Sequence, residues 1–339
     1  MRILYLGNKL QKHGFNPTSI EVLGEKLKEL GEVIQVSEFR SPIIRFLDMV
    51  KTIYINKASV SLVLIDTYST NGFLMAYYSG KLCRYLKLPY VPILHGGDLP
   101  KRLERSPEKC NEFFKNAEFL VAPSGYMKKQ FQLKGYNNIK MIPNQIDVNK
   151  FKYKERVSAN PNILWVRSFN QIYNPLLAIQ TLKQVLESYP EATLCMVGPD
   201  KDGSLELVKN RVKEYGLEKH VKFAGKLSRK DWFLESSNYD IFLNTTNVDN
   251  TPLSIMEAMA LGMIVVTTNV GGIPFLFEDG KEGIMVSPND ADILSQKIVE
   301  IVSNPDFAAS LSKNAREKSK YWDWLFVREL WKKNLAKVK

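Results

Sequence analysis

The chain has 339 residues, a length that suits two domains of about 150–200 residues each. Its hydrophobic content of 45% and charged content of 24% are those of a folded globular protein, and they exclude a disordered, collagen-like or coiled-coil chain. The net charge of +11 favours polyanionic partners, namely nucleic acid, anionic lipid or phosphorylated small molecules, without selecting among them.

The cysteines and the hydropathy indicate a compartment. The three cysteines lie far apart and form no CxxC motif, which excludes a disulfide framework or a zinc ribbon, so we interpret them as reduced thiols of a cytoplasmic protein. The apolar run at residues 2–6 is too short for a signal peptide. The sequence contains no stretch of about 20 apolar residues, the length needed to span a membrane.

Short apolar runs alternate with amphipathic segments of helical length, a pattern typical of parallel α/β architecture. In the first half we expect strands at residues 2–6, 33–36, 62–65, 90–94 and 119–122, and a helix at 19–30 that ends at Gly31. In the second half we expect strands at 162–166, 193–197, 221–223, 241–244, 264–267 and 283–286, and helices at 175–188, 205–215, 252–261 and 290–302.

These elements predict two Rossmann-like domains with parallel sheets, at residues 1–148 and 160–318, joined by a polar linker at 149–161. Because ligands of open α/β sheets bind outside the carboxyl ends of the strands, two such sheets facing each other imply a cleft between the domains. An aromatic last helix, at 320–339, is expected to dock by burying its Trp and Phe side chains.

The most informative segment is residues 247–260. Thr251 is a good N-cap and Pro252 suits the first position of a helix. The N–H groups of Leu253 and Ser254 would then point out of the helix start and form an anion site suited to phosphate. A capped helix without a ligand is the alternative interpretation.

Two acidic residues flank this helix start. Asp249 and Glu257 are separated by seven residues, and carboxylates can accept hydrogen bonds from sugar hydroxyls. With Gly271 and Gly272 downstream, the segment resembles the E-x7-E signature of the family 4 glycosyltransferases, retaining enzymes of the GT-B fold, with Asp249 in place of the first Glu. The resemblance implies that Asp249 faces the donor sugar and that Glu257 holds the ribose hydroxyls of a nucleotide.

Further segments are similar to the same family in order and spacing. Residues 143–147 resemble its P-N-G-[VI]-D motif, with Gln145 in place of Gly, and residues 221–225 resemble its strand before the base-binding loop. The resemblance implies donor contacts at Asn144, Gly198, Lys226 and Leu227, an N-terminal domain that binds the acceptor, and a C-terminal helix that packs back on that domain.

Arg167 directly follows the expected strand at 162–166 and matches the arginine that the family uses for the donor diphosphate. A guanidinium fork suits phosphate oxygens, although a solvated loop arginine is the alternative. The lysine that the family usually has five or six residues later is absent, and Ile172, Tyr173 and Asn174 occupy that place. Stabilisation of the leaving group would then fall to Arg167, Asn174 and the helix N-terminus.

Four residues of the first half follow strands. His95, with Gly96, matches an H-G motif that implies a histidine near the transferred sugar; a structural histidine is the alternative. Asp98 is expected to orient that ring or to bind acceptor hydroxyls, and Ser124 is a weaker acceptor candidate. Gly7 partly fits a loop that admits the donor phosphate, although the usual Gly-Gly pair is absent.

Residues 40–57 mix bulky apolar side chains with cations, which fits either an interfacial membrane helix or a core helix. Lys101, Arg102 and Arg105 add positive charge near His95. These cations would suit a phosphate-bearing acceptor, such as a polyprenyl-diphosphate-linked sugar at the inner face of the plasma membrane. A solvated basic surface is the alternative.

Together these features predict a retaining hexosyl- or hexosaminyltransferase that moves a sugar from a UDP- or GDP-sugar to a hydroxyl of a glycan or lipid-linked acceptor, in polysaccharide or glycoconjugate synthesis. We expect no metal and no cofactor, because preorganised N–H and guanidinium groups can stabilise the leaving diphosphate. The rivals are a nucleotide-sugar epimerase and a non-catalytic basic protein; the scattered cations lack a nucleic-acid-binding signature.

Overall fold

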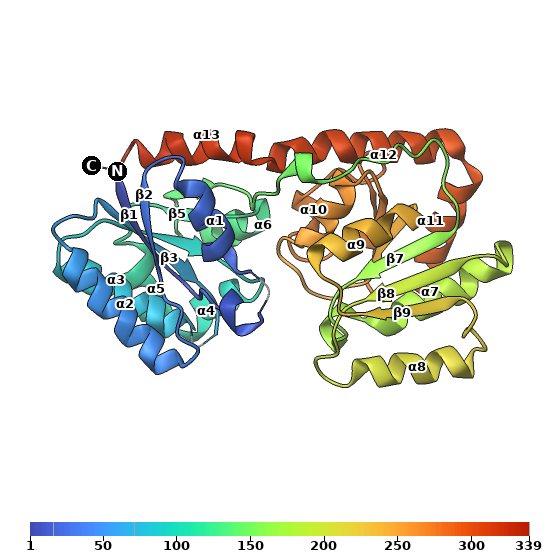
Figure 1. Ribbon diagram of the computed structural model, residues 1–339, viewed down its shortest axis with the longest axis horizontal. Coiled ribbons are helices and arrows are strands. Elements are labelled where there is room, and N and C mark those ends of the chain that lie inside the picture. Colours follow the sequence, from blue (N-terminus) through green and yellow to red (C-terminus); the bar gives the residue numbers. More distant parts are fainter. Residues whose placement is uncertain (16, 71, 339) are drawn as a thin grey trace. The chain divides into compact units, whose positions relative to one another are not determined.

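The computed structural model describes residues 1–15, 17–70 and 72–338, and it divides into two compact units (Figure 1). Unit 1 consists of Met1–Gln145 and Trp324–Lys339, and unit 2 of Ile146–Asp323. Each unit contains one six-stranded parallel sheet. The class predicted from the alternation of strands and helices, two parallel α/β sheets, is confirmed.

The sheet of unit 1 has the strand order β2-β1-β3-β4-β5-β6. Its strands are β1 (Arg2–Leu6), β2 (Glu32–Val36), β3 (Leu62–Thr67), β4 (Tyr90–Leu94), β5 (Leu120–Ala122) and β6 (Ile139–Met141). Its helices are η1 (Gln11–His13), α1 (Ser19–Leu27), α2 (Pro42–Asn56), α3 (Gly72–Tyr85), α4 (Leu99–Arg105), α5 (Pro107–Phe114), α6 (Gly125–Leu133) and α13 (Trp324–Leu335).

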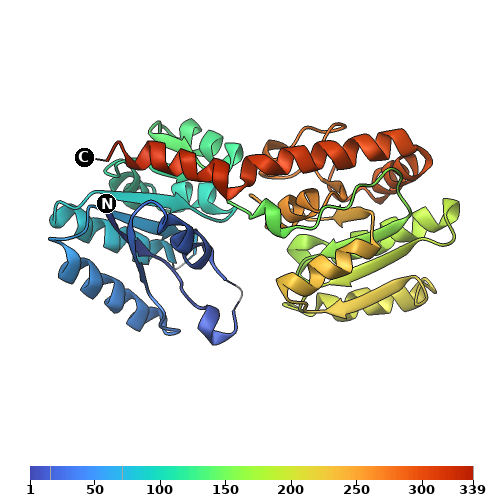
Figure 2. The same ribbon diagram turned by 45° about the horizontal axis from the view of Figure 1, so that its top comes forward.

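Helices cover both faces of this sheet because successive strand residues alternate between two apolar cores. Leu4 and Leu6 of β1 join the core that contains α2 and α3 residues, whereas Ile3 and Tyr5 join the core that contains α1 and α13 residues. The C-terminal helix α13, red in Figures 1 and 2, contributes Trp331 to the second core. The first and last segments of the chain are therefore packed into one unit.

The sheet of unit 2 has the strand order β12-β11-β10-β7-β8-β9. Its strands are β7 (Asn162–Val166), β8 (Thr193–Val197), β9 (Val221–Gly225), β10 (Ile241–Asn244), β11 (Ile264–Thr268) and β12 (Ile284–Val286). Its helices are η2 (Val148–Lys150), η3 (Gln171–Tyr173), α7 (Pro175–Ser188), α8 (Ser204–Glu214), α9 (Arg229–Glu235), η4 (Ser236–Asn238), α10 (Leu253–Ala260), η5 (Ile273–Phe275), α11 (Ala291–Ser303), α12 (Pro305–Ser319) and η6 (Lys320–Trp322).

Two local predictions are wrong. Helix α1 ends at Leu27, three residues early, because the N–H groups of residues 28–30 bond to carbonyls three residues back and tighten the chain into turns, so Gly31 is not its C-cap. The segment at 149–161 is not a free linker. Arg156 is 3% exposed and donates hydrogen bonds to the carbonyls of Tyr239 and Leu261, which fixes the segment to unit 2.

The burial of Trp331 predicts a large loss of stability on truncation. Its side chain is 2% exposed in the core of unit 1, so Trp331→Ala should lower the free energy of unfolding by about 3–5 kcal/mol. On the same helix, Phe326 is 46% exposed, and Phe326→Ala should cost less than about 1 kcal/mol. Denaturant unfolding of both variants measures the difference, and equal losses would contradict the docking of α13 through Trp331.

Candidate active site

In both sheets the strand order reverses at one point, and the loops there diverge. In unit 2 the reversal lies between β7 and β10, and in unit 1 between β1 and β3. Open parallel sheets bind ligands at such points, outside the carboxyl ends of the strands. The loop residues at these two points are therefore the candidate site residues, and the two units are described separately.

Arg167 and Asp249 form an ion pair at the reversal in unit 2. Arg167 directly follows β7, and Asp249 lies in the loop after β10. The guanidinium also approaches the Oδ1 of Asn244, with Nε at 3.5 Å, and lies over the ring of Tyr173 at 4.6 Å. Arg167 and Asp249, which the sequence indicated separately, thus lie together. Asn244 and Tyr173, which contact Arg167, were not among the expected site residues.

The charge of Arg167 is preserved despite burial. The side chains of Arg167 and Asp249 are only 16% and 15% exposed. Burial lowers the pKa of the Arg167 guanidinium to about 10, because desolvation disfavours its charged form, while the neighbouring Tyr173 acts in the opposite direction. The group therefore remains a cation at neutral pH and can bind an anion that competes with Asp249.

Glycines allow the loops at this point to approach closely. A Cβ at Gly271 or Gly272 would collide with the carbonyl of Asp249 or Asn250, respectively, and the N–H of Gly272 donates to the carbonyl of Asp249 at 2.9 Å. Gly198, after β8, has φ +153°, and a Cβ there would collide with the carbonyl of Arg167. Backbone contacts thus fix the positions of both charged residues.

Helix α10 starts beside this pair, one residue later than predicted. The N-cap is Pro252, whose ψ of 110° is extended, and Leu253 is the first helical residue, so Thr251 is not the N-cap. The buried hydroxyl oxygens of Thr251 and Ser254 have no hydrogen-bond partner in the described part of the chain. Hydroxyl and free N–H groups gathered at a helix start suit the binding of an anion.

Glu257, on the buried side of α10, forms an ion pair with Arg229 at the start of α9. The Glu257 side chain is 7% exposed, whereas that of Arg229 is 50% exposed. Burial raises the pKa of the Glu257 carboxyl, and the charge of Arg229 opposes that shift. The sequence analysis missed Arg229, although it lies only two residues beyond Leu227.

The other expected donor residues have varied surroundings. Asn174 adopts a left-handed conformation at φ 46°, caps α7, and donates from Nδ2 to the Oδ1 of Asn289 at 2.8 Å. Lys226 is exposed, and Leu227 packs against the same core as α10. Asn144 is half-buried and belongs to unit 1.

At the reversal in unit 1, Asp66 holds His95. The Nε2 of His95 lies 2.7 Å from the Oδ1 of Asp66, and the hydroxyl of Tyr5 donates to the same oxygen at 2.8 Å. Because a carboxylate oxygen accepts, Nε2 is assigned the hydrogen of this contact, which makes Nδ1 the acceptor when the ring carries one proton. The Tyr68 ring stacks on the imidazole at 5.0 Å between centroids.

Gly7 lets the loop after β1 approach Asp66, since a Cβ there would lie 2.5 Å from its Oδ2. That oxygen and the hydroxyl of Ser79 are buried without partners in the described structure, and both residues line a cavity of about 20 Å³. A polar cavity of this size can hold a water molecule.

Asp98 does not orient His95, contrary to one of the two roles expected for it. It precedes α4, and its carboxylate pairs with Lys101 at 3.2 Å and with Arg105 at 3.5 Å, because both cations follow on that helix. Ser124 is buried, and its oxygen accepts the N–H of Met127 at 3.1 Å as the N-cap of α6. The orienting carboxylate is Asp66, which the sequence analysis had placed just outside a strand.

The described residues offer neither a metal site nor a reactive thiol. Among residues 1–15, 17–70 and 72–338, no three His, Cys, Asp or Glu side chains gather as a metal site would require. The three cysteines are buried. Burial raises the pKa of Cys83 and of Cys110 to about 12 and also raises that of Cys195, so these thiols are poor nucleophiles at neutral pH.

None of the described helices is long and apolar enough to cross a membrane.

The family described as glycosyl transferases group 1 matches residues 147–318, just over half of the chain. The chain belongs to this family. The predicted kinship with glycosyltransferases is therefore confirmed, whereas membership of family 4 stays a prediction.

Several known proteins are similar to this chain over more residues than the family match covers. An uncharacterized glycosyltransferase of Methanocaldococcus jannaschii is 24% identical over 70% of the chain and 66% of its own length. Alpha-monoglucosyldiacylglycerol synthase of Acholeplasma laidlawii is 25% identical over 62% of the chain and 56% of its own length. The alignments thus cover less than two thirds of both relatives.

Among solved structures, HepE of Anabaena superposes with a TM-score of 0.78 at 20% identity, covering 99% of this chain and 100% of its own. Its crystal structures are complexes with UDP, with UDP and glucose, and with UDP-glucose. At this identity the likeness shows the fold, and the predicted GT-B fold is confirmed.

The Arg229–Glu257 pair predicts a pH-dependent loss of stability in Arg229→Ala. Without the guanidinium the pKa of Glu257 rises further, and a carboxyl with a raised folded-state pKa stabilises the fold below its unfolded pKa and loses that contribution as pH rises. Breaking a buried pair costs about 3–5 kcal/mol, but half of Arg229 is exposed, so we expect about 1–2 kcal/mol at neutral pH.

Melting temperatures between about pH 5 and pH 8 measure this effect, which should grow with pH. The double variant Arg229→Ala/Glu257→Gln should lose the added pH dependence because no carboxylate remains to be ionised. A loss in Arg229→Ala that is equal at all pH values would contradict the prediction.

Proposed function

We propose that the protein is a retaining glycosyltransferase that takes a sugar from a nucleotide diphosphate. The observation that carries this proposal is the buried ion pair of Arg167 and Asp249 beside the start of α10. The complexes of HepE with UDP and UDP-glucose support a uridine diphosphate donor. Membership of the glycosyl transferases group 1 family supports the reaction class.

The reaction breaks the bond between the anomeric carbon and a diphosphate oxygen while an acceptor hydroxyl attacks from the same face. Negative charge builds up on the diphosphate, and the departing phosphate takes the acceptor's proton. Arg167, released from Asp249, the N–H groups at the start of α10 and the hydroxyls of Thr251 and Ser254 stabilise that charge. These groups are already in place, so the proposed mechanism needs no metal.

Glu257 and Asp249 bind the remainder of the donor. Arg229 pairs with Oε1 of Glu257, which leaves Oε2 to accept hydrogen bonds from the ribose hydroxyls. Asp249, once separated from Arg167, faces the sugar. His95 presents Nδ1, the free acceptor atom of a ring fixed by Asp66, to a hydroxyl of the donor sugar or the acceptor.

The acceptor is a glycan or a lipid-linked sugar, bound by unit 1. The exposed cations Lys101 and Arg105 of α4, close in sequence to His95, suit an acceptor that carries phosphate. The name of the relative from Acholeplasma laidlawii, a glucosyldiacylglycerol synthase, supports a lipid-bearing acceptor. A cytoplasmic protein at the inner face of the membrane would meet such a substrate.

Removal of Arg167 tests the donor site. Arg167→Ala should lower kcat about 100- to 1,000-fold, because it removes a group that stabilises the leaving diphosphate. Glu257→Ala should raise the KM for the donor about 10- to 100-fold through lost hydrogen bonds to the ribose. Transfer from UDP-glucose, measured in the presence of a chelator, reports both effects and the need for metal.

Arg211→Ala is the matched control, because Arg211 pairs with Glu214 on α8 and the same charge is removed. Undiminished transfer by both Arg167→Ala and Glu257→Ala would overturn the site. Formation of an epimer from the donor without an acceptor would instead support an epimerase.

Removal of Asp66 tests the assignment of His95. Asp66→Ala frees the ring and should lower kcat about 100-fold with little change in the KM for the donor, since misplacement by about 1 Å suffices for such a loss. Asp66→Asn keeps an oxygen for both hydrogen bonds and should restore much of the rate. The double variant Asp66→Ala/His95→Ala should be no slower than His95→Ala alone; additive losses would show that Asp66 does not act through His95.

A further inference from the structure

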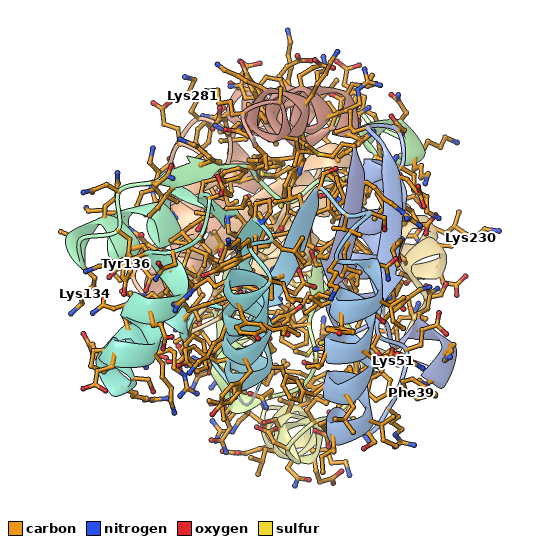
Figure 3. All side chains as sticks on the ribbon, turned by 90° about the vertical axis from the view of Figure 1, so that its left-hand side faces the viewer. Phe39, Lys51, Lys134, Tyr136, Lys230 and Lys281 are labelled. Atoms are coloured by element: carbon orange, nitrogen blue, oxygen red, sulfur yellow. The ribbon has the colours of Figure 1, made fainter. Side chains whose placement is uncertain are left out.

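The outward face of α2 is apolar, which is unusual for a surface helix. Its buried side consists of Arg45, Met49 and Ile53, and Figure 3 faces α2 and labels Lys51 beside it. The opposite side exposes five large apolar side chains by 49–74%: Ile43, Ile44, Leu47, Tyr54 and Ile55. Contiguous exposed apolar residues of this kind indicate an interaction surface.

Helix α3 extends this surface. Leu74, Tyr78 and Tyr85 recur at helical spacing on one side of α3 and are 39%, 46% and 84% exposed. The ring of Phe46 on α2 meets the ring of Tyr78 edge to face, at 6.3 Å between centroids, so the two exposed sides are joined. We call these residues of α2 and α3 the α2–α3 surface.

The charges on the α2–α3 surface are nearly all positive. Exposed cations lie before, within and after α2 and on α3: Arg40, Lys51, Lys57 and Lys81. Residues 40–57 and 72–85 contain one acid, Asp48. The Nζ of Lys57 lies 4.1 Å from the centroid of the Tyr54 ring, so a cation and a large apolar side chain are adjacent on this surface. Apolar residues interspersed with lysine match a lipid surface with anionic headgroups.

A second copy of the chain fits this surface poorly. A twofold interface formed by this surface would bury Lys51 and Lys81, and lysine is depleted in the buried centres of protein interfaces. On a bilayer the same lysines extend their ammonium groups to the headgroups while the apolar side chains enter the acyl boundary. The charge pattern therefore favours a membrane.

The buried sides of the same helices wall the candidate site of unit 1. Met49 of α2 and Met75 of α3 line the cavity of about 20 Å³ together with Gly7, Asp66 and Tyr68. One layer of two helices therefore separates the α2–α3 surface from the residues that hold His95. A bilayer bound to this surface would lie within the thickness of a helix of the place where we propose that the acceptor reacts.

We propose that the α2–α3 surface docks the protein on an anionic bilayer, with the apolar side chains of α2 inserted among the lipids. The proposal concerns residues of unit 1 only, and vesicle binding without a donor tests it. If the chain does not bind vesicles, the proposed transfer reaction can still hold. If the chain does not transfer sugar, the proposed membrane docking can still hold.

The test compares vesicles of phosphatidylcholine alone with vesicles that also contain phosphatidylglycerol. The full chain should co-sediment with the anionic vesicles, and binding should weaken as salt is raised. Leu47→Glu/Ile55→Glu should weaken binding at least about tenfold through lost burial of two large apolar side chains. Lys51→Ala/Lys81→Ala should weaken it about 25-fold on anionic vesicles only, at about fivefold per lysine.

The matched control is Leu133→Glu/Leu207→Glu, on α6 and α8, which changes the same number of exposed apolar residues and the same charge. It should stay within about threefold of the unmodified protein because neither α6 nor α8 contributes residues to the α2–α3 surface. Melting temperature and the thermal shift with UDP check that the variants are folded.

Three results would overturn the proposal. The first is no binding of the unmodified chain to anionic vesicles at low salt. The second is an equal loss in the Leu47→Glu/Ile55→Glu and Leu133→Glu/Leu207→Glu proteins, which would make binding a matter of net charge. The third is a dimer, detected by sedimentation, that Leu47→Glu/Ile55→Glu dissociates and anionic vesicles leave intact, which would assign the surface to a second copy.

Discussion

Burial of a charged group together with its hydrogen-bonding partners, where the loops after neighbouring parallel strands diverge, is the constraint on which both candidate sites depend. In unit 2, Arg167 and Asp249 compensate each other, and in unit 1 Asp66 accepts hydrogen bonds from His95 and Tyr5. A buried charge without a partner costs several kcal/mol, so each group needs its partner in the absence of a substrate. The same partners hold the candidate groups in place, and in the proposed reaction a diphosphate takes over the role of Asp249.

The backbone around these charges is set by residues that contribute no side-chain chemistry. Gly272 lets its segment touch the carbonyl of Asn250, Gly198 does the same at the carbonyl of Arg167, and Gly7 admits the carboxylate of Asp66. Alanine at these positions would displace a charged group without changing any charge. In this sense the position of the charges in the proposed reaction follows from close backbone contacts at strand ends.

Helices α2 and α3 lie between the candidate site of unit 1 and the proposed membrane-binding surface. Their inner sides line the cavity beside Asp66, and their outer sides expose large apolar side chains, which indicates an interaction surface. For residues 40–57 the sequence left a core helix and an interfacial membrane helix as alternatives, and the membrane contact stays a proposal. The inner side of α2 is packed into the core of unit 1, and the outer side is exposed.

The sequence by itself determined the class of fold and the parallel strands other than β6, because strand periodicity is a local property. It also indicated Arg167, Asp249, Glu257 and His95 as candidates, through their places at strand ends or a helix start and through the resemblance to a glycosyltransferase family. Only the tertiary structure showed the partners of these residues. Arg229 and Asp66 lie 28 and 29 residues from Glu257 and His95, and no local pattern indicates these pairings. Their pairing follows from strand order and helix packing, which bring together residues that are distant in the chain.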